Sequence, residues 1–271
     1  MEGITLTQFC TIVIIILLAG CEKQRPHELE TLGARFDMDL FGDLQALQFT
    51  YKKSVPKDLL HLPSEIRQLN VQGTPVTGLH IKHWKNLTGL EELNLTGTQI
   101  NNQDLALFKH FQKLKILHLG NTLIKGSGLS NLGGIPHMKA LHLGNNKLGT
   151  GNTQHLSSLT RLHILDLTNT GIQDDDLKPI SNLKSLEWLW LSGNRITNKG
   201  LTHLSELTKL KGLYLNHTLV SFKGFPSLKP LRSLETVWIV NRKVNHTHIG
   251  YLKSHLPEDC FINVRQPAHN P

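Results

Sequence analysis

The sequence predicts an α/β solenoid, in which short repeated units stack because no unit can bury its apolar side chains alone. Three observations predict it: an aliphatic residue recurs at a constant interval, a second aliphatic residue follows it by two positions, and a polar turn residue follows at a fixed distance. The recurring residues are spaced by 24 positions: Leu69, Leu93, Leu117, Leu141, Leu165, Leu189, Leu213 and Val237.

Each unit begins with a predicted strand and ends with a predicted outer segment. In Leu165-Asp166-Leu167, apolar and polar residues alternate, which is typical of a strand with one buried face. Leu177, Ile180, Leu183 and Leu186 are then spaced by three residues, which favours a helix or a 3₁₀-like segment on the outer side.

One unit, written out, is Leu162-x-x-Leu165-x-Leu167-x-x-Thr170-x-Ile172. This resembles the leucine-rich repeat, L-x-x-L-x-L-x-x-[N/T]-x-[I/L], and the match extends from Ile66 to about Val244. The resemblance implies a curved solenoid with a parallel sheet on its inner face. It also assigns the family's Asn position to Thr74, Thr98, Thr122, Asn146, Thr170, Asn194 and Thr218.

The turn after each strand carries polar residues with two expected roles. At the family's Asn position, the side chain is expected to bond backbone groups that would otherwise be buried without a partner. Asn102, Asp174 and Asn198 share another repeat position. There we expect a short polar side chain to accept hydrogen bonds from the first free N–H groups of the helix that follows.

Both ends of the repeat array depart from the period. A weaker unit at Leu44, Leu47 and Phe49 looks like an N-terminal cap, and Leu256-Pro257-Glu258-Asp259-Cys260-Phe261-Ile262 resembles the ending of many bacterial repeat proteins of this kind. Cys260 and Ile262 would be the inward pair of a closing strand, and Cys260 a buried, inert thiol. The predicted organisation is a signal peptide at 1–20 with a lipobox at 18–21, a polar tether at 21–40, a cap repeat at 41–65, repeats at 66–245 and a C-terminal cap at 246–271.

Composition excludes several classes of protein. The chain has three cysteines, of which one, Cys260, lies in the folded body, so a disulfide framework is excluded. The formal charge of +8 favours anionic partners such as lipid headgroups or acidic wall polymers. The Lys and Arg residues are scattered and no basic stripe is interleaved with aromatic residues, so we expect no nucleic-acid partner.

The N-terminus resembles that of a bacterial lipoprotein. Residues 11–19 are apolar and too short to span a bilayer, and they lead into Leu18-Ala19-Gly20-Cys21, which looks like a lipobox. The resemblance implies lipidation of Cys21, and Glu22 after it implies an outer-membrane location if the cell has two membranes. The alternative is a misassigned start or an uncleaved apolar tail, because Met1 to Phe9 contains no Lys or Arg.

The expected concave face carries an aromatic group. Trp190, Tyr214 and Trp238 share one position on three successive strands, about 4.8 Å apart per strand, and Trp188 lies beside them. Trp84, in contrast, lies at a core position of an outer segment. Contiguous exposed aromatic residues mark binding surfaces, which predicts a peptide, protein or glycan ligand. The alternative is a ladder of rings that stabilises the sheet.

A second group, His118, His142 and Asp166, shares one position on three successive strands. These residue types bind zinc, but ladder side chains run parallel rather than converging, so we expect a polar part of the ligand-binding face and no metal site. Because imidazole titrates near neutrality, the group is also a hypothetical pH sensor.

Catalytic motifs are missing from the sequence: it contains no Gly-x-Ser-x-Gly, no His-Glu-x-x-His and no phosphate-binding glycine-rich loop. We therefore expect no enzyme and no cofactor. The sequence favours a membrane-anchored binding module of the bacterial cell envelope that uses its aromatic concave face. The alternatives are a structural or adhesive envelope lipoprotein that acts through its basic surface, and a component of a larger assembly.

Overall fold

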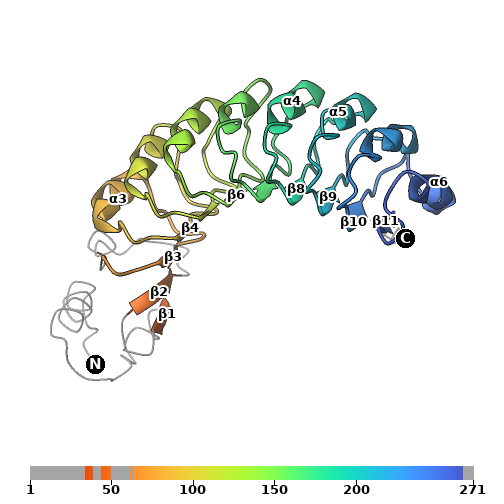
Figure 1. The fold of residues 1–271 in the computed structure, drawn as a ribbon. Helices are drawn as coiled ribbons and strands as arrows, with labels where there is room; N and C mark the ends of the chain where they lie inside the picture. Colours follow the sequence, from red (N-terminus) through yellow and green to blue (C-terminus); the bar gives the residue numbers. More distant parts are fainter. Residues whose placement is uncertain (1–33, 39–43, 50–61, 63, 265–271) are drawn as a thin grey trace, which may run out of the picture.

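The computed structural model describes residues 34–38, 44–49, 62 and 64–264, and these form a curved arc (Figure 1). The strands line the inner, concave side of the arc and the short helices lie on its outer, convex side. This confirms the predicted fold class, an α/β solenoid with a parallel inner sheet.

One sheet of eleven strands runs through the described part of the chain in sequence order. Strands β1 (Ala34–Met38) and β2 (Leu44–Phe49) pair antiparallel, and every later pairing is parallel. From β3 to β10 each pairing joins equivalent residues, as in Leu165 with Leu189. The remaining strands are β3 (Gln68–Asn70), β4 (Glu92–Asn94), β5 (Ile116–His118), β6 (Ala140–His142), β7 (Ile164–Asp166), β8 (Trp188–Trp190), β9 (Gly212–Tyr214), β10 (Thr236–Trp238) and β11 (Phe261–Asn263).

The outer segments are short helices of α and 3₁₀ type, as the spacing of three predicts. They are α3 (Gly78–His83), η2 (Trp84–Asn86), η3 (Asp104–His110), η4 (Gly126–Gly134), η5 (Thr153–Leu156), η6 (Asp174–Asp176), α4 (Leu177–Ile180), α5 (Asn198–Thr202), η7 (Phe222–Leu228), η8 (His246–His248) and α6 (Ile249–Lys253). Leu177 and Ile180 of α4 are fully buried, so the apolar side of this segment faces the sheet.

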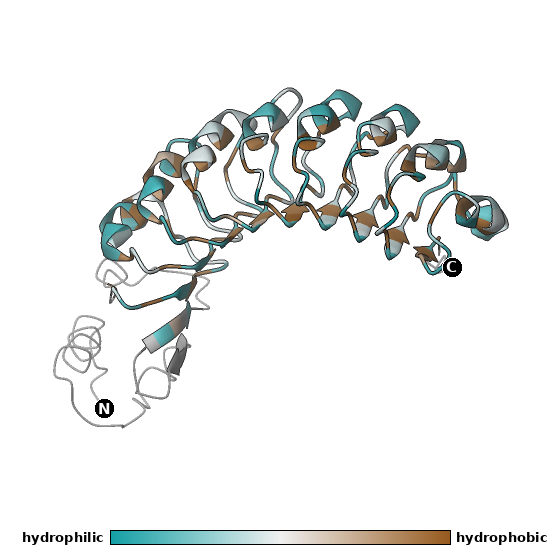
Figure 2. Ribbon diagram, viewed as in Figure 1, coloured by the Kyte–Doolittle hydropathy of each residue, from teal (hydrophilic) through white to brown (hydrophobic). Residues whose placement is uncertain are grey.

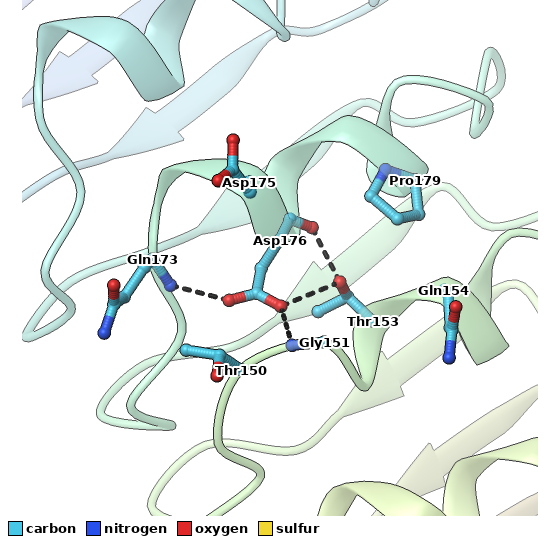
Figure 3. A pocket seen from close by; sticks show the side chains of 8 residues that line it. All are labelled: Thr150, Gly151, Thr153, Gln154, Gln173, Asp175, Asp176 and Pro179. Carbon is cyan, nitrogen blue, oxygen red and sulfur yellow. Dashed lines mark hydrogen bonds between the residues drawn. The ribbon is translucent and has the colours of Figure 1, made fainter.

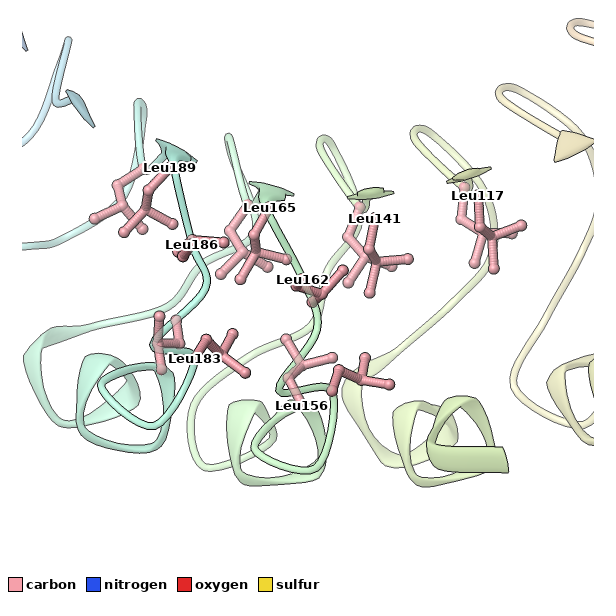
Figure 4. Close-up of a cluster of buried hydrophobic side chains, with 14 of the residues drawn as sticks. Leu117, Leu141, Leu156, Leu162, Leu165, Leu183, Leu186 and Leu189 are labelled. Carbon is pink, nitrogen blue, oxygen red and sulfur yellow. The ribbon is translucent and has the colours of Figure 1, made fainter. Parts of the chain in front are cut away.

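The core lies between the sheet and the outer segments. Leu117, Leu141, Leu165 and Leu189 point inward from successive strands toward leucines of the outer segments (Figure 4). Hydrophobic residues follow this inner layer, and hydrophilic residues cover the outer side of the helices (Figure 2). Burial of each such leucine stabilises the fold by about 1.5–3 kcal/mol. Trp84 is fully buried, as predicted for a packing residue.

The residues at the family's Asn position bond the turn as predicted. The Thr170 hydroxyl donates to the carbonyl of Leu167 at 2.7 Å, within its own turn. Asn194 reaches further, because its amide donates to the carbonyl of Leu167 at 2.6 Å and accepts from the backbone N–H of Thr170 at 3.1 Å. At this position, Thr170 therefore donates a hydrogen bond within its own turn, whereas Asn194 also links its turn to the preceding repeat.

The expected role of Asn102, Asp174 and Asn198 as caps of their own helices was wrong. Their side-chain oxygens accept hydrogen bonds from backbone N–H groups of the next repeat, namely those of Lys125 at 2.6 Å, Thr197 at 2.7 Å and Ser221 at 2.8 Å. In these units the helical segment begins at the residue itself or two residues after it. The nearest free backbone N–H groups therefore belong to the turn of the following repeat. These residues therefore tie successive repeats together.

The N-terminal end of the sheet differs from the predicted tether. Residues 34–38, placed within that tether, form β1 and pair with β2. The predicted signal peptide, the lipobox, Cys21 and most of the tether lie outside the described residues. Within the described residues, no helix is long and apolar enough to cross a membrane.

The C-terminal end closes on β11, which pairs with β10 and places Ile262 beside Val237. Cys260 is buried, and burial raises the pKa of its thiol to about 11. At neutral pH the thiol is therefore protonated and unreactive, as predicted.

Candidate ligand-binding face

Strand pairing places the predicted site residues in one row across the concave face. In this row each residue is the register partner of the next: His118, His142, Asp166, Trp190, Tyr214 and Trp238. Trp188 lies in the neighbouring row, two residues before Trp190 on the same strand. The structure therefore brings all seven predicted residues of this face together.

The aromatic half of the row is a continuous stack. The rings of Trp190 and Tyr214 lie 4.9 Å apart with 11° between their planes, and those of Tyr214 and Trp238 lie 6.1 Å apart with 18° between them. All three side chains are partly exposed. Since ring faces point along the solenoid toward neighbouring rings, it is mainly ring edges that face the concave space.

The position of the Trp188 ring depends on Gly212, which has no side chain. Its ring lies over Gly212 of the next strand, where an added Cβ would meet the indole carbon Cε3 at 2.1 Å. The same ring is stacked at 6.2 Å and 25° on Trp190. Gly212 therefore leaves the space that this indole occupies.

The polar half of the row contains two stacked imidazoles. The rings of His118 and His142 lie 4.4 Å apart and are nearly parallel, with 7° between their planes. Burial lowers the pKa of both groups from its usual value. Glu92, 3.6 Å from His118 Nε2, opposes that shift for His118, and Asp166 opposes it for His142. For His142 the neighbouring His118 lowers the pKa further.

Asp166 joins the two halves without bonding to either. Its carboxylate accepts from the backbone N–H of Thr168 at 2.9 Å, and the ring of His142 lies 6.4 Å from that of Trp190. No group of three His, Cys, Asp or Glu residues within the described chain is arranged to hold a metal ion.

Phe261 was missed as a site residue from the sequence, and it lies in the neighbouring row, the row of Trp188, as the register partner of Thr236. It lies on β11, is 58% exposed, and its ring is 6.3 Å from that of Trp238 at 59°. The signal was available, because inward-facing Cys260 and Ile262 leave Phe261 on the opposite side of the closing strand.

A pocket on the outer side, between η5 and the start of α4, is a structural joint (Figure 3). Its central group is the carboxylate of Asp176, which accepts from the backbone N–H groups of Gly151 at 2.6 Å and Gln173 at 2.9 Å. The Thr153 hydroxyl donates to the carbonyl of Asp176 at 2.7 Å. These polar groups thus hold two repeats together, and we do not assign a ligand to this pocket.

The comparisons with known proteins agree with this architecture. A family model described as leucine rich repeat matches residues 160–220, which include β7, β8 and β9. The fold is that of a leucine-rich repeat solenoid. Among solved structures, the chain is similar to internalin C2 from Listeria monocytogenes str. 4b F2365, with a TM-score of 0.60 and 24% identity over 74% of this chain and 87% of that chain. No curated protein sequence matches this chain.

Proposed function

We propose that this leucine-rich repeat protein is an interaction module that binds a protein partner on its concave face. The observation that carries the proposal is the partly exposed aromatic row Trp190, Tyr214 and Trp238. The rings of Trp188 and Phe261, in the neighbouring row, lie beside its two ends. Trp and Tyr are the usual anchors of protein interfaces, because each combines a large apolar area with a polar N–H or O–H group.

The stacking favours a protein or peptide over a glycan. A sugar ring would stack on an aromatic face, but both faces of Tyr214 are directed at neighbouring indoles, at 4.9 and 6.1 Å. Ring edges, indole N–H groups and the Tyr214 hydroxyl remain for contact, and these suit apolar side chains and backbone carbonyls. The alternative is that the rings form a ladder that only stabilises the sheet. Such a ladder would show the same stacking, so an experiment must distinguish it from a binding surface.

The polar half gives the proposed partner a second kind of contact. His118 and His142 offer ring nitrogens, and Asp166 offers a carboxylate, beside the aromatic half of the same row. A partner that spans both halves therefore presents an apolar region next to a polar one.

The test is retention of a partner from solubilised envelope by the full chain and by a Trp190→Ala/Tyr214→Ala/Trp238→Ala variant. Loss of the anchors is expected to weaken binding about 100-fold. A matched control, Leu79→Ala/Leu123→Ala/Leu219→Ala, removes exposed apolar side chains at positions outside the concave strands.

Binding lost in the concave variant and kept in the control, with both variants folded by circular dichroism, supports the proposal. Equal retention by all three proteins, or retention by none, assigns the aromatic row to sheet stabilisation. Tyr214→Phe removes the hydroxyl without removing a ring, so it reports whether that hydroxyl contacts the partner.

We also propose that the module is anchored to the bacterial cell envelope through lipidated Cys21, at the outer membrane if the cell has two membranes. The support is the sequence Leu18-Ala19-Gly20-Cys21 at the end of an apolar run. Several acyl chains on one residue anchor a protein durably, since each buried CH₂ adds about 0.8 kcal/mol. Mass spectrometry of the mature protein is expected to find an acylated N-terminal Cys21, and an unmodified Met1 would contradict the anchor.

A further inference from the structure

Three consecutive repeats carry basic residues on both sides of a buried apolar residue, just before their strands. The triplets are Lys113-Leu114-Lys115, His137-Met138-Lys139 and Arg161-Leu162-His163. Leu114, Met138 and Leu162 are buried in the core. Burial of the middle residue directs its two neighbours outward, so each repeat presents a pair of basic groups.

Hydrogen bonds place these pairs side by side. The backbone N–H of Lys139 donates to the carbonyl of Lys115 at 2.7 Å, and that of His163 donates to the carbonyl of Lys139 at 2.8 Å. The guanidinium of Arg161 reaches back to the carbonyl of Pro136 at 3.3 Å. The six residues Lys113, Lys115, His137, Lys139, Arg161 and His163 therefore form one array, here called the basic flank. Four of the Lys and Arg residues, which were expected to be scattered, thus lie side by side.

The acids beside the basic flank are already engaged. Glu91 accepts a hydrogen bond from Lys115 at 2.6 Å, and this bond, with the charges of Lys115, Arg67 and Lys113, lowers the pKa of its carboxyl. On the other side Glu187 pairs with Lys211 at 2.8 Å. Within the described part of the chain, Lys113, Lys139 and Arg161 form no ion pair with an acid, so their positive charge is uncompensated.

We propose that the basic flank docks on the surface of an anionic lipid bilayer. The unpaired charges of Lys113, Lys139 and Arg161 are spread over three repeats, and the pocket described above lies elsewhere. This arrangement suits a broad surface of negative charge better than a discrete ligand. No aromatic residue lies in the three triplets, so the array lacks the stacking groups that single-stranded nucleic acids use.

Docking through this flank leaves the concave face accessible. Because the strands are parallel, the segments that precede them lie along one side of the solenoid, at the N-terminal ends of the strands. The segments that follow the strands lie along the other side. A bilayer on the first side would lie beside the concave face, not across it. This inference uses residues outside the aromatic row, so it stands or fails independently of partner binding.

The test is acetylation of lysines in the full chain, mixed with vesicles in excess and read by mass spectrometry. Vesicles of phosphatidylcholine with phosphatidylglycerol are compared with vesicles of phosphatidylcholine alone. We expect Lys113 and Lys139 to react several-fold more slowly with the anionic vesicles, and 1 M salt to abolish the difference because charge is screened within about 3 Å. Exposed Lys125 and Lys147, which follow strands β5 and β6 and lie on the opposite flank, should be unaffected.

Two variants that each lose one positive charge complete the test. Arg161→Gln is expected to weaken the protection of Lys113 and Lys139 by about fivefold, as for one basic group lost near an anionic surface. Arg195→Gln, on the opposite flank, should leave it unchanged. Equal protection on both flanks, or none, overturns the proposal. Protection by inorganic polyphosphate with the zwitterionic vesicles, as strong as that by anionic lipid, assigns the flank to a soluble polymer and also overturns it.

Discussion

One backbone position in each turn adopts the left-handed conformation. Residues with positive φ recur at the repeat interval, from +52° to +72°: Gly73, Gly97, Asn121, Asn145, Asn169, Gly193 and His217. Only glycine takes this conformation without strain, and Asn and His are the side chains that tolerate it best after glycine. This residue preference was visible in the sequence, but the conformation behind it comes from the structure.

Gly73→Ala should isolate the cost of that conformation. Gly73 has φ +71° and an added Cβ would meet nothing within 4 Å, so strain is the only penalty. We expect the free energy of unfolding in urea to fall by about 1 kcal/mol. The control Gly134→Ala also adds a methyl group in open space, but its φ lies outside the left-handed region. Equal effects of the two substitutions would contradict the explanation.

The stacked imidazoles predict a pH dependence of stability. Burial lowers the pKa of His118 and His142 below 6.5, so the unfolded chain binds protons at a higher pH than the folded chain. Stability is therefore full above about pH 6.5 and is lost as the pH falls below it. Unfolding in urea between pH 7 and pH 5 should show this slope, and His142→Gln should flatten it. An unchanged slope would show that the pair is not its source.

At the scale of the strand, the small residue beside an indole decides where the indole lies. Ala140, Ile164, Trp188 and Gly212 share one repeat position. The sheet accepts Ala at this position in β6, but in β9 the ring of Trp188 occupies the space that a Cβ would need.

Gly212→Ala should therefore displace Trp188. We expect a loss of about 1–3 kcal/mol in stability from overpacking, together with a shift of tryptophan fluorescence. Binding of any partner that contacts Trp188 should weaken as well. Ala140→Gly, at the equivalent position, removes a methyl group without moving an indole and should leave the fluorescence unchanged. A folded Gly212→Ala protein with wild-type fluorescence would show that Trp188 keeps its environment and that Gly212 does not determine its position.

The sequence predicted strands and concave positions well because both follow from the alternation of inward and outward side chains. It did not predict the stacking of His118 on His142 or of Trp188 over Gly212, because ring orientation depends on the residue of the neighbouring strand. It also missed β1, where Ala34-Arg35-Phe36-Asp37-Met38 alternates over one short segment outside the repeat period. The bonds of Asn102 and Asp174 to the next repeat were missed for the same reason, since period alone does not say which unit supplies the donor.

At the scale of the whole molecule, each repeat contacts only its neighbours. A central strand such as β7 has partners on both sides, whereas β11 pairs within the described chain only with β10. In such an array, stability is a sum of local terms and interfaces between neighbours, so the interior should open less readily than the end.

Hydrogen exchange measures this difference directly. The backbone N–H of Leu167 donates to the carbonyl of Trp190 at 2.9 Å, and that of Ile239 donates to the carbonyl of Asn263 at 2.8 Å. Both donors belong to buried residues and the two bonds are alike in length, so a difference in exchange reports position along the solenoid. We expect the amide of Ile239 to exchange faster than that of Leu167 by at least tenfold. Equal rates would mean that the solenoid opens as one cooperative unit, in which case ligand contacts at Trp238 would stabilise the whole chain rather than its C-terminal end.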